Sequence, residues 1–361
     1  MSATAKVQNW VDERLDVEEL SAPLLEKTVP IHRHSHWYFL GGITLFFFMV
    51  QIATGLLLLL YYRPSANEAY ESVQHITNQV HFGWLVRSIH AWSANLMVLS
   101  AFAHLFSVAF YRAFRKPREL TWISGVLVLF VVLGFGFSGY LLPWNTRAYF
   151  ATKVGTEVPG QIPVIGRAIM IFMRGGEDVT GATLSRFFAL HVCVLPALAI
   201  GMVMLHLALV QKFGTSVPAS VEKEWTLHPA RRKEIKFFPN FFLRELIGWY
   251  IAFAVLIVLA VLFPSELGIK ADPFGSAPPG IKPEWYFLAQ FQTLRMIPSK
   301  ILGIDGELIG ILGFGVAPVA LIGLPFIETM LGRRGVQLVR AGLVFGLLYL
   351  CGMSLIGYLA K

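Results

Sequence analysis

The stretch SIHAWSANLMVLSAFAHLFSVAFY, residues 88–111, decides the fold of this chain. It contains no Asp, Glu, Lys or Arg, and a helix of this length, rising about 1.5 Å per residue, crosses a hydrocarbon layer of roughly 30 Å. Two histidines, His90 and His104, interrupt its apolar residues. Histidine is costly inside a membrane and marks a functional position there. The stretch therefore predicts a membrane-spanning helix with two functional side chains.

The same kind of stretch recurs along the chain. Cutting the sequence at every Asp, Glu, Lys and Arg leaves seven long uncharged stretches: Trp37–Tyr62, Ser88–Tyr111, Leu120–Thr146, Phe187–Gln211, Leu246–Ser265, Leu308–Ile327 and Ala341–Ala360. The chain is 55% hydrophobic and only 14% charged, and its mean hydropathy is +0.61, unlike a soluble protein. We predict an all-α membrane protein with seven transmembrane helices.

The basic residues indicate how these helices are oriented. A net charge of +8 raises the question of nucleic acid binding. However, the N-terminal segment and the alternate loops at 112–118, 212–244 and 333–340 hold 18 of the 30 Lys and Arg. Because excess Lys and Arg lie on the cytoplasmic side, we expect a multi-pass protein with a cytoplasmic N-terminus and a periplasmic C-terminus. Nucleic acid is not an expected partner.

The spacing of the stretches divides the chain into parts. We predict an N-terminal segment on the cytoplasmic side at 1–36, a four-helix part at 37–213, a polar linker at 214–243 and a three-helix part at 244–361. The 42-residue segment Glu266–Glu307 separates the fifth and sixth stretches. A loop of this length is usually functional or disordered, and its aromatic residues argue against disorder.

Histidines also interrupt the fourth stretch, at His191 and His206. Separations of 14 residues in the second stretch and 15 in the fourth return to nearly the same helix face. Both helices run inward, so His90 and His191 lie near the outer side and His104 and His206 near the inner side. Two helices that each offer a histidine at two matching depths can hold two stacked haems through their irons. No CxxCH motif is present, so we expect two non-covalent b-type haems.

Glycines repeat with the same interval in the neighbouring stretches. Gly41 and Gly55 lie 14 residues apart in the first stretch, as do Gly125 and Gly139 in the third. Glycine lets a flat macrocycle approach the backbone, and the alternative is ordinary packing of small residues between membrane helices. Together with the histidine spacing, the four glycines favour contacts with haem.

Two arginines are further candidates for contacts with haem, and the histidines have one alternative role. Arg87 and Arg118 are placed to pair with haem propionates at the outer and inner levels, and interfacial anchoring is the alternative for each. A proton relay or transporter would also place histidines in a membrane. Such relays use Asp and Glu as well, and the second and fourth stretches contain neither.

Five motifs resemble cytochrome b of the Rieske/cytochrome b family. They are Trp84–His90 (WLVRSIH), Lys116–Leu120 (KPREL), Gly139–Trp144 (GYLLPW), Ile162–Gly166 (IPVIG) and Pro283–Tyr286 (PEWY). The resemblance covers essentially the whole chain, and the order of the motifs together with the histidines makes it specific. Within the family, the spacing of 15 residues in the fourth stretch and the seven stretches are most similar to cytochrome b6 fused to subunit IV.

The resemblance implies a subunit of a bacterial cytochrome bc complex in the inner membrane, a proton-translocating quinol–cytochrome c oxidoreductase of electron transport chains. It implies a Rieske iron–sulfur protein, a c-type cytochrome, quinone and membrane lipid as partners, in a homodimer. Quinol would be oxidised at the outer side, and electrons would pass through the two haems to quinone at the inner side. Glu284 would accept a proton from quinol, with Tyr286 as a second hydrogen-bonding group. From the residues alone, Glu284 reads as a solvated loop carboxylate.

One departure from the b6f branch concerns a third haem. There, a cysteine that precedes the Leu-Gly-Gly of the first helix tethers that haem, and here the position is Phe39. The resemblance therefore implies no covalently bound third haem. Two other functions stay open: a transporter or proton channel, and a di-haem membrane anchor of another quinone-linked oxidoreductase. The second has no reason to carry Pro283–Tyr286.

Overall fold

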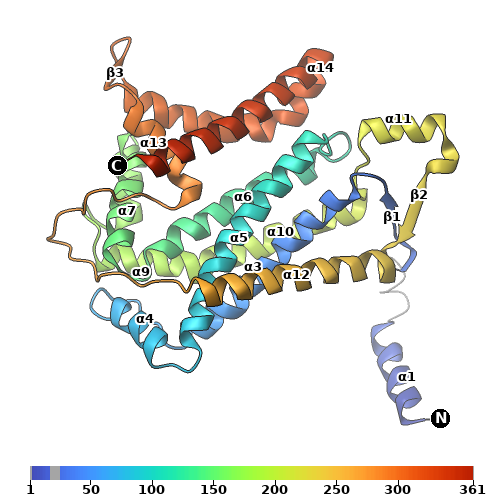
Figure 1. Ribbon diagram of the computed structural model, residues 1–361, viewed down its shortest axis with the longest axis horizontal. Helices are drawn as coiled ribbons and strands as arrows, with labels where there is room; N and C mark the ends of the chain where they lie inside the picture. Colours follow the sequence, from blue (N-terminus) through green and yellow to red (C-terminus); the bar gives the residue numbers. More distant parts are fainter. Residues whose placement is uncertain (1, 17–24, 361) are drawn as a thin grey trace.

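The computed structural model describes residues 2–16 and 25–360 of the chain (Figure 1). The N-terminal segment predicted at 1–36 is therefore described only in part, because residues 1 and 17–24 lie outside this range. The described chain is mostly helical, with two small antiparallel pairs of strands.

Long helices form the body of the molecule, and short helices and strands lie at their ends. The long helices are α3 (Phe39–Leu59), α5 (Gly83–Phe110), α6 (Glu119–Tyr140), α10 (Leu195–Phe213), α12 (Phe242–Leu262) and α14 (Gly306–Leu359). The shorter ones are α1 (Ala3–Leu15), α4 (Ala69–Asn78), α7 (Thr146–Glu157), α8 (Gly166–Arg174), α9 (Gly181–Ala189), α11 (Ala219–Leu227) and α13 (Trp285–Met296). Strand β1 (Thr28–Ile31) pairs with β2 (Lys233–Lys236), and β3 (Lys300–Ile301) pairs with β4 (Ile304–Asp305).

Six helices of the described chain are long and apolar enough to cross a membrane. With adjoining turns included, they are Ser35–Leu59, Gly83–Phe110, Glu119–Tyr140, Gly181–Phe213, Phe237–Leu262 and Gly306–Leu359. The predicted class, an all-α membrane protein, is confirmed. The predicted count of seven is not confirmed, because the last of these helices contains both of the last two uncharged stretches.

Helix α14 turns back on itself between those two stretches. A straight helix of 54 residues would be about 80 Å long, far more than a membrane requires. Gly332 has φ 54° and ψ −126°, which are not helical values. Three residues later, a Cβ on Gly335 would lie only 2.7 Å from the carbonyl oxygen of Ile327. The two arms of α14 therefore lie side by side (Figure 1).

The long helices pack through apolar side chains from distant parts of the sequence. Phe47 of α3, Val98 of α5, Val132 of α6 and Leu256 of α12 belong to one buried cluster. In lipid, such packing rather than water exclusion holds helices together. Helix α12, from the predicted C-terminal part, is thus packed against helices of the predicted N-terminal part.

Different elements gather at the two ends of the bundle (Figure 1). One end carries α4, α7, α9 and α13 together with the loop that follows α12. The other end carries α11 and the pair β1–β2, in which Thr28 lies opposite Lys236. This pairing joins the N-terminal segment to the linker at the entry to α12.

The segment Glu266–Glu307 contains a helix that the sequence analysis did not predict. Helix α13 begins at Trp285, so the Pro283–Tyr286 motif forms its first turn with Glu284 at the N-cap position. Strands β3 and β4 follow it as a short hairpin. The motif is therefore held at the start of a helix rather than in an irregular loop.

Candidate functional site

Each of the four histidines predicted to bind haem iron faces one of the four predicted glycines. If a Cβ atom is built on each glycine, it lies close to Cε1 of the facing histidine. The distance is 3.1 Å for Gly41 and His104 and 3.4 Å for Gly55 and His90. It is 3.0 Å for Gly125 and His206 and 2.5 Å for Gly139 and His191. The first two contacts join α3 to α5, the third joins α6 to α10, and the fourth joins α6 to the π-helical turn Leu190–Val194 that precedes α10. Glycine at these positions leaves room for an imidazole between two helix backbones.

Three of the four imidazoles are also held by a hydroxyl group. Hydrogen bonds join Nδ1 to hydroxyl oxygens in the pairs His90–Thr54 at 2.8 Å, His206–Ser124 at 2.9 Å and His191–Ser138 at 3.0 Å. Each hydroxyl residue directly precedes the glycine that faces the same histidine. Because the bond to Nδ1 fixes the ring, Nε2 is left to bind a metal.

The helix that carries His191 and His206 contains a wider turn. Residues Leu190–Val194 form a π-helix, and Pro196 follows at the start of α10. Proline lacks an N–H, and in a regular helix its ring would clash with the carbonyl of Val192. The wider turn takes up one extra residue. A spacing of 15 residues in this helix therefore matches the spacing of 14 in α5.

The distance between the rings provides a test of whether these residues fit haem iron. The ring centroids of His90 and His191 lie 6.5 Å apart. An iron between two imidazole nitrogens, with bonds of about 2 Å each, requires roughly 6 to 6.5 Å between the centroids. For the second pair, His104 faces Gly41 of α3 and His206 faces Gly125 of α6. The residues present thus fit a bis-histidine iron.

The two predicted arginines lie at the ends of helices. Arg87 donates its guanidinium N–H groups to the carbonyl oxygens of Ser265 and Glu266, the latter at 2.9 Å. Arg118 donates to the carbonyl oxygens of Phe213, at 2.9 Å, and Gly214, at 3.1 Å. Arg87 therefore holds the chain where it leaves α12, and Arg118 holds it where it leaves α10. They lie at opposite ends of the bundle, and the pairing of each with a haem propionate stays a prediction.

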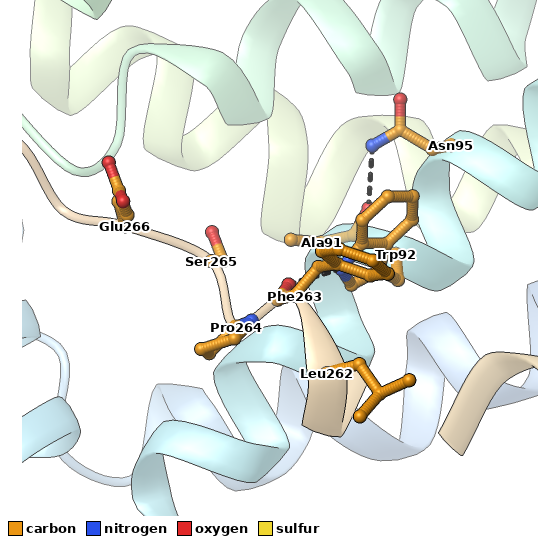
Figure 2. A pocket seen from close by; sticks show the side chains of 8 residues that line it. All are labelled: Ala91, Trp92, Asn95, Leu262, Phe263, Pro264, Ser265 and Glu266. Atoms are coloured by element: carbon orange, nitrogen blue, oxygen red, sulfur yellow. Dashed lines mark hydrogen bonds between the residues drawn. The ribbon is translucent and has the colours of Figure 1, made fainter. Parts of the chain in front are cut away.

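A cavity of about 520 Å³ lies beside Ala91, the residue that follows His90 in α5 (Figure 2). Its lining comes from α5 on one side and from residues 262–266 on the other. Trp92 donates from Nε1 to the carbonyl oxygen of Phe263 at 2.7 Å. The amide oxygen of Asn95 accepts from Nε1 of Trp285 at 2.8 Å. The cavity wall is therefore bonded directly to the first residue of α13.

Glu284 and Tyr286 lie at the same end of the bundle. Burial raises the pKa of the Glu284 carboxyl above its usual range, and the positive charge of Arg147 opposes that shift. The hydroxyl of Tyr286 lies against Gly136 of α6, where a Cβ would be only 2.6 Å away. The structure thus places a half-buried carboxyl and a half-buried phenol next to the helix that carries Gly139.

Non-local contacts hold the segment that leads to Glu284. Asn145 donates from its side-chain amide to the carbonyl oxygen of Leu267 at 2.6 Å, and the N–H of Ala271 donates to that of Trp144 at 3.0 Å. Lys282 donates from Nζ to the carbonyl oxygen of Ala360 at 2.6 Å. The segment is therefore attached to α7 at one end and to the last turn of α14 at the other.

The sequence analysis missed Glu245, a carboxylate inside α12. A Cβ on Gly42 would overlap its Oε1 atom, and within the described residues this buried oxygen has no hydrogen-bond partner. The nearby Phe39, which replaces the cysteine of b6f, stacks on Phe241 with ring centroids 5.0 Å apart. Cutting the sequence at charged residues placed Glu245 just outside the stretch Leu246–Ser265. A charge directly at the edge of an apolar stretch was the signal available.

Comparison with known proteins agrees with this geometry. The family Cytochrome b/b6/petB matches residues 25–214, and the family Cytochrome b(C-terminal)/b6/petD matches residues 270–360. The fold and these family matches define a membrane protein of electron transport, of a family that binds haem. The chain belongs to the cytochrome b family, as predicted, and joins the b6-like and C-terminal parts in one polypeptide.

Individual relatives share most of this length. A cytochrome bc complex cytochrome b subunit of Chlorobaculum thiosulfatiphilum is 49% identical over 324 residues, covering 89% of this chain and 73% of the relative. Cytochrome b6 of Mastigocladus laminosus is 47% identical over 214 residues, covering 59% of this chain and 99% of that protein. A solved chain of a hyperthermophilic respiratory complex III matches with a TM-score of 0.84 at 31% identity, covering 98% of this chain and 91% of that one. The assignment to the subunits of quinol–cytochrome c oxidoreductases is therefore confirmed.

Proposed function

We propose that this chain is the cytochrome b subunit of a bacterial cytochrome bc complex, with quinol oxidised at the outer side of the inner membrane and quinone reduced at the inner side. The observation that carries this proposal is the one-to-one facing of four histidines and four glycines, with ring centroids 6.5 Å apart for His90 and His191. This arrangement suits two haems at two depths. A transporter would have no use for such paired rings.

The two haems are held without covalent bonds in this proposal. His90 and His191 bind the outer iron and His104 and His206 the inner iron, each through Nε2, while Gly41, Gly55, Gly125 and Gly139 make room for the rings. When bound, the haems supply a one-electron path across the membrane. Phe39 offers no thiol, so a tethered third haem is not part of the proposal.

Glu284 acts as the proton acceptor for quinol oxidation. A quinol releases two protons and two electrons when it becomes a quinone, so a base must stand within hydrogen-bond reach. The carboxylate of Glu284 takes a proton from a quinol hydroxyl, and Tyr286 offers a second polar contact. One electron leaves to the Rieske iron–sulfur protein and then to a c-type cytochrome, and the other enters this chain.

Glu245 supplies a proton at the inner side. Reduction of a quinone consumes two protons, and a half-buried carboxyl whose Oε1 atom has no hydrogen-bond partner among the described residues is suited to provide one. Its place in the first turn of α12, beside Gly42, puts it at the end of the bundle opposite Glu284. Protons are thus taken up at one face and released at the other, which couples electron transfer to proton translocation.

The chain crosses the membrane with its N-terminus in the cytoplasm and its C-terminus in the periplasm. Support comes from the distribution of Lys and Arg and from the turn at Gly332, since two arms of α14 give an odd number of crossings. The domain boundaries of the sequence analysis, at 37–213, 214–243 and 244–361, are kept in this proposal. The complex is proposed to be a homodimer in lipid.

A redox difference spectrum of the purified complex, with haem quantitation and a denaturing gel stained for haem, tests the proposal. Two b-type haems per chain, with no haem retained on this chain in the gel, are expected. A spectrum without haem would exclude the proposal. The second candidate, a di-haem anchor of another oxidoreductase, is favoured instead if both haems are present and Glu284→Gln leaves quinol oxidation unchanged.

A further inference from the structure

The four histidines are not supported equally. Thr54, Ser124 and Ser138 each precede the glycine that faces a histidine, and each hydroxyl is bonded to Nδ1 of that histidine. At the fourth position, the residue before Gly41 is Leu40. A leucine side chain offers no hydrogen-bonding group. His104 therefore lacks the partner that the other three histidines have.

The direction of the three hydrogen bonds follows from the other bond of each hydroxyl. Thr54 donates its proton to the carbonyl oxygen of Val50 at 2.6 Å, and Ser138 donates to that of Gly134 at 2.8 Å. Ser124 likewise donates to the carbonyl oxygen of Thr121 at 2.9 Å. Because a hydroxyl has one proton, its lone pairs must accept from the imidazole. The ring proton is thus on Nδ1, and Nε2 is free for iron.

The Nδ1 atom of His104 is buried and has no hydrogen-bond partner among the described residues. Nearby groups are engaged elsewhere. The hydroxyl of Thr44 donates to the carbonyl oxygen of Leu40 at 2.8 Å and lies 3.0 Å from that of Ser100. When iron occupies Nε2, the proton on Nδ1 of His104 consequently has no acceptor among the described residues.

We propose that Leu40, by withholding an acceptor from His104, raises the reduction potential of the haem that His104 and His206 hold. An acceptor on the distal nitrogen increases the electron density that an imidazole donates to a metal, and this favours ferric iron. Without the acceptor, ferrous iron is favoured. Leu40 is thus a positioning residue that makes the two haem levels unequal. This inference rests on the proposed function, since it requires haem at both levels.

A matched pair of variants tests the role of Leu40 in the assembled complex. Leu40→Thr adds a hydroxyl, and Leu40→Val has the same shape without it. In a redox titration followed by visible absorbance, we expect Leu40→Thr to disfavour reduction of one haem about tenfold relative to Leu40→Val, which corresponds to 59 mV for a one-electron couple. The other haem keeps its potential. Thr54→Val is expected to shift that second haem, in the opposite direction.

The outcomes separate this inference from the proposed function. Absence of two b-type haems in the unmodified complex would overturn the proposed function and, with it, the inference. Two haems with equal potentials in Leu40→Thr and Leu40→Val would overturn the inference alone. If Leu40→Thr does not retain haem, Ser124→Ala decides, because it removes the acceptor from His206 of the same haem. An upward shift then supports the inference, and an unchanged potential overturns it.

Discussion

The bundle of α3, α5, α6 and α10 and the segment 263–284 with α13 position their functional groups in different ways. In the bundle, each histidine and its glycine recur at the interval of the helix, so two sites repeat one local pattern. In the segment, Glu284 is held by contacts such as Asn145–Leu267 and Lys282–Ala360, which join distant residues. Sites that repeat along a helix can therefore be predicted from residue spacing. A site on a connecting segment depends instead on contacts with residues far away in the sequence.

The largest effect is expected from Gly139→Ala in the bundle. The added methyl group would lie 2.5 Å from Cε1 of His191, so the imidazole must move and lose its place on the iron. We expect the haem content to fall from two to one per chain and quinol oxidation to fall to background. Haem quantitation and a quinol oxidation assay measure both.

Gly134→Ala is the control for this experiment. It lies in the same helix, but its Cβ would meet only Leu195 at 3.6 Å, an ordinary contact. Normal haem content is expected. If Gly139→Ala also retained both haems at normal content, the close approach of His191 to α6 would have no part in haem binding.

Glu284→Gln is expected to have the next largest effect. Loss of a general base typically lowers the rate by about 10²–10⁴-fold, and the bundle should keep both haems because it is built without this residue. The rate of quinol oxidation and the haem spectrum measure the two expectations. Glu307→Gln changes an exposed carboxylate in the same long segment and should leave the rate unchanged. Equal rates in the two variants would remove Glu284 from the mechanism.

Glu328→Gln tests the connection between the bundle and the C-terminal arms. Arg112 at the end of α5 donates from Nε to Oε2 of Glu328 at 2.7 Å, and a second bond joins the same pair. The carboxylate side chain is only 9% exposed. Because the change removes charge-assisted hydrogen bonds and leaves Arg112, whose side chain is only 21% exposed, without its carboxylate, we expect a loss of about 2 kcal/mol of stability. Thermal unfolding in detergent measures this loss.

A double variant sharpens the interpretation of Glu328. If Arg112→Gln is combined with Glu328→Gln, no unpaired charge is left, so the double variant should be less destabilised than the sum of the two single variants. Additive losses would show that the two side chains act independently.

The smallest effect is expected from Arg147→Gln, in the pH profile. Glu284 accepts a proton only as a carboxylate, so the rate falls as the pH decreases through its pKa. Burial raises that pKa and Arg147 opposes the shift. Removing Arg147 raises the pKa further, so the acid side of the profile should move to higher pH while the maximal rate changes little. A profile that moves to lower pH would contradict this assignment.

Much of the bundle could be predicted from the sequence. Uncharged stretches located the long helices, and the spacing of His90, His104, His191 and His206 indicated two levels without any tertiary information. The facing glycines followed from the same interval. The family motifs added Glu284, which spacing alone could not distinguish from a solvated carboxylate. The long helices and the facing of each histidine by a glycine were predictable because helical periodicity is a local property.

Other features depended on contacts between distant residues. Helix α13 was not expected, because it lies in a segment that was predicted as a connecting loop, and its Leu288 packs against Gly357 of α14. Arg87 and Arg118 bind carbonyl groups that no local pattern identifies. Glu245 was set aside because a charge was used to mark the end of a stretch. In each case the deciding partner lies far away in the sequence.

The pairing of β1 with β2 bears on how such a chain could be divided. Thr28–Ile31 holds Lys233–Lys236 through a strand ladder, and the N–H of Phe237 also donates to the carbonyl oxygen of Lys27 at 2.7 Å. A gene split between the codons of Gly214 and Ala219 would therefore yield two polypeptides that still recognise each other through these backbone bonds. The fused chain already contains a docking contact of the kind that a two-gene arrangement requires.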